Sequence, residues 1–378
     1  MNLHTARLAR AIASALVFGI PAFSQTAIET AFSVMADDNI NNSADAVADR
    51  IASLSLDAGS TWEWNRSSLH ASYRGGLDYF AAVVDRSTLS HGVNIGFTTP
   101  LNDDGSTQFD AAAFGFLRSG RGDYRILDHQ ILSLALSLSH EDEGVWSITG
   151  GYRIRGLSFP ELSSYDYSEH VLSAQTSFFF PTRTTVIVDS DVGLKVDAAS
   201  ANDSMASGRM AGSRTSPLAS LGAVQWRASM RIGQALLENT GISVSALYQE
   251  NLKSGSHTLA SINGLVSGDE LFDDRYGYEG FGWSVMMTQV LPFDARLRAV
   301  WSQETKDYAS LPAYDLTGTM IAAHRNDRRS VASLSWEQDA SFLPVSFTVL
   351  YEHIVNASND PYFSYTNNAF TVVLAVPF

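Results

Sequence analysis

Charged side chains stand at alternate positions in segments whose other positions are apolar. Arg153 and Arg155 flank Ile154, and Arg227 and Arg231 alternate with apolar residues of their own segment. In a β-strand, side chains two residues apart point to the same side, so these charges share a face with small polar residues. Arginines and carboxylates on one polar wall attract, repel and orient small ions and dipolar solutes. The chemistry that these residues suggest is electrostatic selection.

Motifs of catalytic chemistry are missing from the chain. No G-x-S-x-G, H-E-x-x-H or phosphate-binding loop motif occurs in it. Ser254, Ser256 and His257 lie close together, but in a long polar segment with no fixed acidic partner, so a plain loop is the better interpretation. We expect a protein that is not an enzyme, with no catalytic, cofactor-binding or metal-binding residues and no cofactor.

Acidic residues cluster in two polar segments. Carboxylates at this density can hold Ca²⁺, but the EF-hand spacing is absent, which favours solvated loops. The acidic positions are Asp269, Glu270, Asp273 and Asp274 in segment 253–275, and Asp37 and Asp38 with Asn39 before the second expected strand.

The composition excludes several classes of protein. The chain has 378 residues, with 25 basic and 40 acidic side chains, a formal charge of −15 and no cysteine. The acidic balance excludes a basic nucleic-acid binder, and the lack of cysteine excludes a disulfide scaffold and a cysteine-ligated zinc site. After the N-terminal segment, no apolar run approaches the roughly 18 residues of a membrane helix. A large soluble β protein or a membrane β-barrel remains.

The N-terminus has the order of a secretory signal peptide. Arg7 and Arg10 precede an apolar stretch over 11–20, and small residues follow as far as Ser24. This order predicts an exported protein with a signal peptide over 1–24. The alternative, an ordinary amphipathic first helix, fits the pattern less well.

After the signal peptide the dominant period is two. Leu132, Leu134, Leu136 and Leu138 share one face, and small residues including Ala135 occupy the other. Such alternation predicts a strand with one apolar and one polar face. We expect residues 25–378 to form one all-β domain of about sixteen strands, with fourteen as the alternative count. The expected spans are 28–37, 48–62, 66–80, 88–100, 107–119, 126–140, 144–158, 167–180, 183–197, 216–234, 240–252, 276–291, 294–309, 325–340, 343–358 and 364–378.

The connections between these strands alternate in length. Short turns alternate with longer polar segments, which is the asymmetry of a transmembrane antiparallel up-and-down β-barrel of the outer membrane. A soluble sandwich would show the same alternation of apolar and polar residues, but it has no reason to sort its connections by end. The short turns are 64–65, 102–105, 141–143, 181–182, 238–240, 292–293 and 341–342, and the longest connections are 198–215, 253–275 and 310–324.

Aromatic residues gather at both ends of the expected strands, as in the two girdles of a membrane barrel. At the short-turn ends they are Trp62, Trp64, Trp146, Phe178, Phe180, Phe293, Phe342 and Phe378. Near the long-loop ends they are Tyr79, Phe80, Tyr276, Tyr278, Tyr308, Tyr362 and Tyr365.

The last strand carries a recognisable ending. Phe370, Val372, Leu374 and Val376 alternate up to the terminal Phe378. This ending resembles the signal that the barrel-assembly machinery recognises in Gram-negative outer-membrane proteins, and the chain as a whole resembles porins and porin-like channels. The resemblance implies a place in the outer membrane of a Gram-negative bacterium, with lipid, lipopolysaccharide and the assembly machinery as partners.

The polar face would then line the lumen. In a ring of sixteen, strands eight apart face each other, which sets Glu352 opposite Arg153 and Arg155, and Asp57 opposite Arg227 and Arg231. The alternative is pairing between neighbouring strands, such as Asp189 or Asp191 with Arg227, and Arg298 with Glu337. The lumen-lining candidates are Arg74, Arg153, Arg155, Arg227, Arg231, Arg296, Arg298, Asp57, Asp189, Asp191, Glu337 and Glu352.

A porin-like channel for passive diffusion of small hydrophilic solutes or ions is the expected function, since a barrel of this size can hold an aqueous channel. Any constriction is expected from segment 198–215 or 253–275. The alternatives are a barrel for export of exopolysaccharide or a surface lipoprotein with a periplasmic partner, and a structural or adhesive barrel. The sequence leaves the oligomeric state open.

Deleting Phe378 should impair assembly into the outer membrane, because the terminal aromatic residue completes the apolar stripe of the last strand. Surface protein measured by outer-membrane fractionation should fall relative to the full chain. Normal surface levels of the truncated chain would contradict the assignment of Phe378 as an assembly signal.

Overall fold

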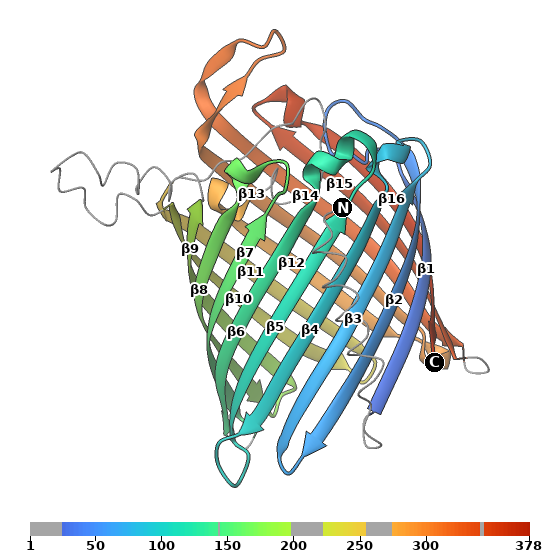
Figure 1. The fold of residues 1–378 in the computed structure, drawn as a ribbon, viewed down its shortest axis with the longest axis vertical. Helices are drawn as coiled ribbons and strands as arrows, with labels where there is room; N and C mark the ends of the chain where they lie inside the picture. The colour runs from blue at the N-terminus through green and yellow to red at the C-terminus, as the bar shows by residue number, and fades with distance from the viewer. Residues whose placement is uncertain (1–24, 143, 198–221, 255–273, 341–343) are drawn as a thin grey trace, which may run out of the picture.

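The computed structural model describes residues 25–142, 144–197, 222–254, 274–340 and 344–378. These residues form a closed barrel of sixteen antiparallel strands in sequence order (Figure 1). The signal peptide expected over 1–24 lies outside the described residues, as do connection 198–215 and residues 216–221 of one expected strand. The all-β barrel expected from the alternating pattern is confirmed.

The strands agree with the expected spans to within a few residues at most ends. They are β1 (Gln25–Asp37), β2 (Asp49–Trp64), β3 (Ser67–Phe80), β4 (Thr88–Pro100), β5 (Thr107–Ser119), β6 (His129–Asp142), β7 (Trp146–Ser158), β8 (Tyr167–Phe180), β9 (Thr184–Asp197), β10 (Ala223–Leu237), β11 (Thr240–Lys253), β12 (Glu279–Val290), β13 (Arg296–Tyr314), β14 (Met320–Ala340), β15 (Val345–Ser358) and β16 (Tyr365–Pro377).

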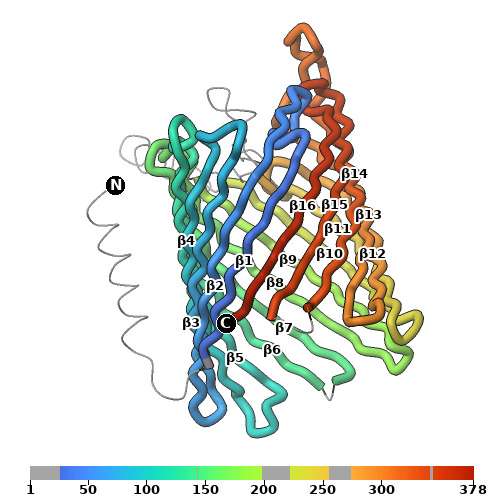
Figure 2. The backbone as a smooth tube through the Cα atoms, turned by 90° about the vertical axis from the view of Figure 1, so that its right-hand side faces the viewer, coloured from blue at the N-terminus to red at the C-terminus, as the bar shows by residue number. Residues whose placement is uncertain are grey.

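The barrel closes between its first and last strands. In the β1–β16 ladder, Phe32 lies opposite Leu374 and Val34 opposite Val372. The backbone N–H of Phe378 extends the seam by donating to the Ile28 carbonyl, 2.7 Å away. The first strand is therefore a full member of the sheet (Figure 2).

The apolar face of the sheet points outward. Leu132, Leu134, Leu136 and Leu138 are each at least half exposed, and exposed Leu, Val, Ile and aromatic side chains continue around the barrel. A soluble protein rarely exposes an apolar surface of this extent, whereas a membrane barrel presents such a surface to lipid. The soluble-sandwich alternative is therefore wrong, because the apolar faces do not meet in a core.

No helix among the described residues is long and apolar enough to cross a membrane. The helical pieces among the described residues are short 3₁₀ helices of three to six residues. At the loop end of the barrel these are η1 (Val84–Arg86), η2 (Gly122–Leu127), η3 (Ser163–Tyr165), η5 (Arg275–Gly277) and η7 (Pro361–Phe363), and η6 (Pro292–Asp294) lies at the short-turn end.

The connections are sorted by length as expected, with one correction. Segment 310–324 is not a long loop: β13 and β14 continue through it and meet at a short turn over 315–319. The resulting hairpin projects above the rest of the barrel (Figure 1, orange). Asp315 closes its tip, because its carboxylate accepts hydrogen bonds from the backbone N–H groups of Thr317 and Thr319. Because the turn needs only a few residues, β13 and β14 extend through most of the segment that was expected from the sequence to be a loop.

A small apolar core lies at the loop end. Tyr124 and Leu127 of the η2 turn pack with Leu157 and Phe159 at the end of β7, and Leu127 is fully buried. The connection between β5 and β6 is thereby held against the barrel wall.

Leu134→Arg should damage folding far more than Ala135→Arg, because Leu134 is exposed on the apolar face and Ala135 lies on the other. A charge at the lipid midplane costs about 2–4 kcal/mol, while substitutions in a barrel lumen mainly tune selectivity. The folded fraction can be measured by the heat-dependent shift of the barrel on gels. Equal folded fractions for the two variants would show that the facing is wrong.

Candidate functional site: the charged inner wall

The register of the ladders decides which side each charged residue faces. Residues directly opposite in an antiparallel pair point to the same side, and outward Leu134 lies opposite Ile154 while Ala135 lies opposite Arg153. Following the ladders around the closed barrel places all lumen-lining candidates on the face opposite the exposed apolar residues. Their contacts then distinguish paired from unpaired charges.

Two pairs join neighbouring strands. Asp57 on β2 and Arg74 on β3 are opposite in register, and their Oδ1 and Nε atoms lie 2.5 Å apart. Arg296 on β13 contacts Glu337 on β14 with 3.4 Å between Nη1 and Oε2. Glu337 therefore pairs with Arg296 rather than with Arg298, since Arg296 and Glu337 are opposite in register.

Glu169 is the centre of a larger ionic cluster. Its side chain is only 4% exposed, and its carboxylate lies 3.3 Å from Nη2 of Arg153, 3.8 Å from Nη1 of Arg155 and 3.1 Å from Nη2 of Arg275. The phenol of Tyr276 also donates to it, at 2.8 Å. Arg153 and Arg155 are therefore balanced by a carboxylate on the next strand, not by Glu352 across the barrel.

The residues that contact Glu169 come from two parts of the chain. Arg275 and Tyr276 belong to η5, which precedes β12, while Glu169 lies on β8. Arg275 also reaches Asp191 on β9, 3.4 Å away, and the Gln225 side chain on β10 donates to the Arg275 carbonyl at 2.6 Å. The segment just before β12 thus lies against the inner face of β8, β9 and β10.

Glycine makes room for this contact. A Cβ atom added to Gly193 on β9 would lie 2.2 Å from the Tyr276 hydroxyl and 2.5 Å from Nη2 of Arg275. No larger residue leaves space for the η5 side chains there. Burial, and next the negative charge of Glu169, raise the pKa of Tyr276, so this phenol remains a neutral donor.

A second buried contact secures the same segment. Lys195 on β9 pairs with Asp274 and lies 3.7 Å from Asp197, and all three side chains are less than a tenth exposed. Asp274 had the appearance of a solvated acidic loop residue, and that interpretation is wrong. Its neighbours Asp269, Glu270 and Asp273, together with Ser256 and His257, lie outside the described residues.

Three arginines of the candidate set remain without an ion-pair partner among the described residues. Arg227 and Arg231 lie on β10 and Arg298 on β13. Asp189 does not pair with Arg227: it accepts hydrogen bonds from Gln175 and Ser229 instead. Asp189 and Glu352 are therefore the two candidate carboxylates without a cationic partner among the described residues. Among the candidates, unpaired positive charge therefore lies on β10 and β13.

Three of the aromatic residues expected in the loop-end girdle lie elsewhere. Tyr276, Tyr278 and Tyr308 are buried, and the rings of Tyr278 and Tyr308 are 5.4 Å apart. Lys306 lies over Tyr278 and Arg325 over Tyr308, at 4.5 and 4.4 Å from the ring centroids. These tyrosines hold cations on the inner wall, so their assignment to a lipid-facing girdle is wrong.

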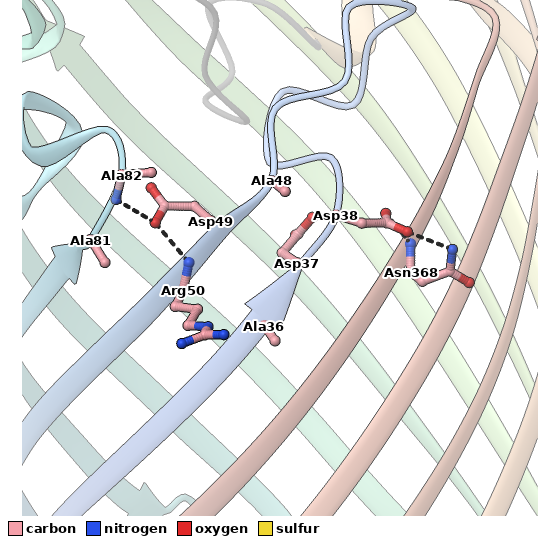
Figure 3. Close-up of a pocket in the computed structure, with 9 residues that line it drawn as sticks. All are labelled: Ala36, Asp37, Asp38, Ala48, Asp49, Arg50, Ala81, Ala82 and Asn368. Atoms are coloured by element: carbon pink, nitrogen blue, oxygen red, sulfur yellow. Dashed lines mark hydrogen bonds between the residues drawn. The ribbon is translucent and has the colours of Figure 1, made fainter.

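The acidic segment after β1 borders an open hollow of about 620 Å³ at the loop-end rim (Figure 3). Carboxylates at this rim hold the connections: Asp49 at the start of β2 accepts from the N–H groups of Ala82 and Arg50, and Asp38 accepts from the N–H and side chain of Asn368. The described residues contain no group of three or more His, Cys, Asp or Glu side chains placed to hold a metal ion.

Sequence reasoning missed Glu169, Lys195 and Arg275. The first two could have been found, because they alternate with outward residues such as Leu172 on β8 and Val192 on β9. Arg275 lies in a segment without periodicity, so its approach to the wall had no signal in the sequence.

No family model and no curated protein match the sequence. Solved structures do match the fold. OpdL from Pseudomonas aeruginosa has a TM-score of 0.50 and 12% identity, with 95% of this chain and 99% of OpdL covered. OccAB1 from Acinetobacter baumannii has a TM-score of 0.52 and 9% identity, with 96% of this chain and 98% of OccAB1 covered.

A third likeness is to CdiB from Acinetobacter baumannii, with a TM-score of 0.52 and 11% identity. It covers 92% of this chain but only 60% of CdiB. At these identities the likenesses concern the fold. With the closed sheet and the exposed apolar face, they make the chain a porin-like outer-membrane β-barrel in architecture.

Glu169→Gln should lower the stability of the barrel, because it leaves Arg153, Arg155 and Arg275 without their shared carboxylate. Removing one partner of a buried ionic cluster costs about 3–5 kcal/mol. The temperature of the gel-mobility shift measures the loss.

The matched control is Glu337→Gln. Its pair with Arg296 has side chains 47% and 44% exposed, and breaking an exposed pair costs at most about 1 kcal/mol. Equal shifts for the two variants would mean that the Glu169 cluster does not secure the segment before β12.

Proposed function

We propose that this protein is a porin-like channel in the outer membrane of a Gram-negative bacterium, through which small hydrophilic solutes or ions diffuse. The observation that carries the proposal is the inner face of the barrel, which is polar and bears the unpaired guanidinium groups of Arg227, Arg231 and Arg298. A barrel whose interior served only as packing would have no need of unpaired charges. In contact with water, these groups attract anions and orient dipolar solutes.

The segment before β12 is the proposed narrowing of this channel. Arg275 and Tyr276 project from the loop end onto the inner face, where Glu169 and Asp191 hold them. An element held by buried ion pairs keeps its place more firmly than one held by exposed pairs. The arginines on β10 lie beside it, because Arg227 is opposite Asp191 in register. Solutes passing this level would meet both groups.

The outer surface supports the proposed membrane partners. Exposed aromatic residues lie at the short-turn end, among them Trp64, Phe178 and Phe180, and Tyr79 lies toward the loop end. Aromatic side chains at both ends of an apolar band are typical of barrels held between two lipid interfaces. We therefore include outer-membrane lipid, lipopolysaccharide and the barrel-assembly machinery among the proposed partners. Phe378, whose ring is exposed, is the proposed assembly signal.

Conductance of the purified protein in planar bilayers tests the channel directly. A steady, open conductance is expected. A barrel that stays closed would overturn the proposal and favour export with a periplasmic partner, or a structural or adhesive role.

Replacing Arg227 and Arg231 together by Gln should shift ion selectivity toward cations, because it removes unpaired positive charge and leaves Asp189 and Asp191 on the neighbouring strand. The reversal potential in a salt gradient measures the shift. The shift should shrink as salt rises, since the Debye length falls from about 10 Å at 0.1 M to about 3 Å at 1 M.

Arg66→Gln is the control for this selectivity test. Arg66 lies in the β2–β3 turn, where it pairs with Asp103, and both side chains are exposed. Its loss should move the reversal potential much less. An unchanged potential in the Arg227 and Arg231 variant would show that ions do not pass these arginines.

A further inference from the structure

A hollow of about 250 Å³ lies in the inner wall across β11, β12, β13 and β14. Two neighbouring rows of inward residues line it, and each row has one residue from each of these four strands, opposite one another in register. The first row is Leu247, Gly282, Glu304 and Arg329, and the second is Ser245, Ser284, Ser302 and Val331. Gly282 gives the hollow its depth, because this position of the first row has no side chain.

Glu304 and Arg329 are opposite each other in register but form no ion pair. Glu304 is engaged loosely, at 3.4 Å from the Tyr278 hydroxyl and 3.9 Å from Nζ of Lys306. The Nε atom of Arg329 is buried and has no hydrogen-bond partner among the described residues. A buried donor without an acceptor is costly, so a group entering the hollow would be stabilised if it brought an acceptor oxygen.

The second row adds hydroxyl groups. Ser245 and Ser284 share a hydrogen bond of 2.7 Å between their Oγ atoms, and Ser302 lies beside them in the same row. A hydroxyl can both donate and accept. Together with one carboxylate acceptor and one guanidinium donor, the hollow offers both kinds of partner within a small space.

We propose that this hollow is a binding site for a neutral, hydroxyl-rich solute about the size of one sugar ring. The proposal rests on the channel function, because the solute would reach the hollow from the lumen. An anion would be repelled by Glu304 and a cation by Arg329, whereas a polyol supplies O–H donors for the carboxylate and lone pairs for the guanidinium. Leu247 and Val331 give apolar contact at diagonally opposite corners of the two rows.

Three probes of one size test the charge preference: glucose, gluconate and glucosamine. Saturation-transfer NMR on the detergent-solubilised full chain measures binding without any current, and competition gives the order of affinity. Glucose should bind most tightly. Tighter binding of gluconate would make the hollow an anion site, and tighter binding of glucosamine a cation site, and either result would overturn the proposal.

Two variants connect the binding to this hollow. Gly282→Val fills it without changing charge, and a Cβ at that position meets its nearest atom, the Gln303 carbonyl oxygen, at 3.6 Å, an ordinary contact. Glu304→Gln replaces the charged carboxylate acceptor by a neutral amide, which keeps only one acceptor oxygen. Either variant should weaken glucose binding about tenfold or more. Gly282→Val does so because it occupies the space of the solute, and Glu304→Gln because a hydrogen bond to a charged group contributes roughly 1.5–3 kcal/mol.

Asp110→Asn is the matched control for the charge change. Asp110 lies on β5, eight strands from β13, and its carboxylate accepts from Thr98 and Gln108 on its own part of the wall. Its glucose affinity should equal that of the unchanged chain. Loss of affinity in this control, or unchanged affinity in both hollow variants, would overturn the site.

Bilayer recordings separate this proposal from the channel function. A protein that conducts ions but does not bind glucose is a channel without this site. A protein that binds glucose in detergent but never conducts retains the site and loses the channel function.

Discussion

Every backbone N–H and C=O group of a strand in lipid must find a partner within the sheet, because the hydrocarbon offers none. Here that requirement is met by closing β1 on β16. Closure in turn fixes the face of each residue, since alternation along a strand and register between strands leave no freedom at any position. The exposed leucines of β6 and the inward arginines of β7 are two consequences of the same hydrogen-bond ladder.

The inner wall that results is uneven. One side of the loop end carries a small apolar core around Leu127, while β8 and β9 carry buried ion pairs around Glu169 and Lys195. The arginines of β10 and β13 lie beyond these neutralised clusters. Inward charges that hold neighbouring strands together are therefore distinct from inward charges that remain unpaired, and only contacts, not residue types, distinguish the two.

Alternation was sufficient to predict the strands, because a strand with lipid on one side and polar groups on the other must alternate strictly. β6 and β16 were clear for this reason. The alternating pattern failed to predict the structure beyond the lipid-facing part of the strands. There the hairpin of β13 and β14 extends above the barrel, and its turn at Asp315 had no periodic signal. The pairing of Asp57 with Arg74 follows from the fact that β2 and β3 are consecutive strands joined by a short turn. The contacts of Arg275 depend on a fold-back that only the three-dimensional structure reveals.

The contacts of the η5 segment bear on the order in which the barrel forms. Tyr276 and Glu169 are 107 residues apart, and Lys195 and Asp274 are 79 apart, whereas the seam of β1 with β16 joins residues more than three hundred positions apart. Bringing distant segments together costs more chain entropy than bringing nearer ones together. The strands from β8 to β12, with their ionic cluster, can therefore assemble as one unit before the ring is complete. The part of the wall formed by β8 to β12 would then already be folded when β16 pairs with β1 and closes the barrel.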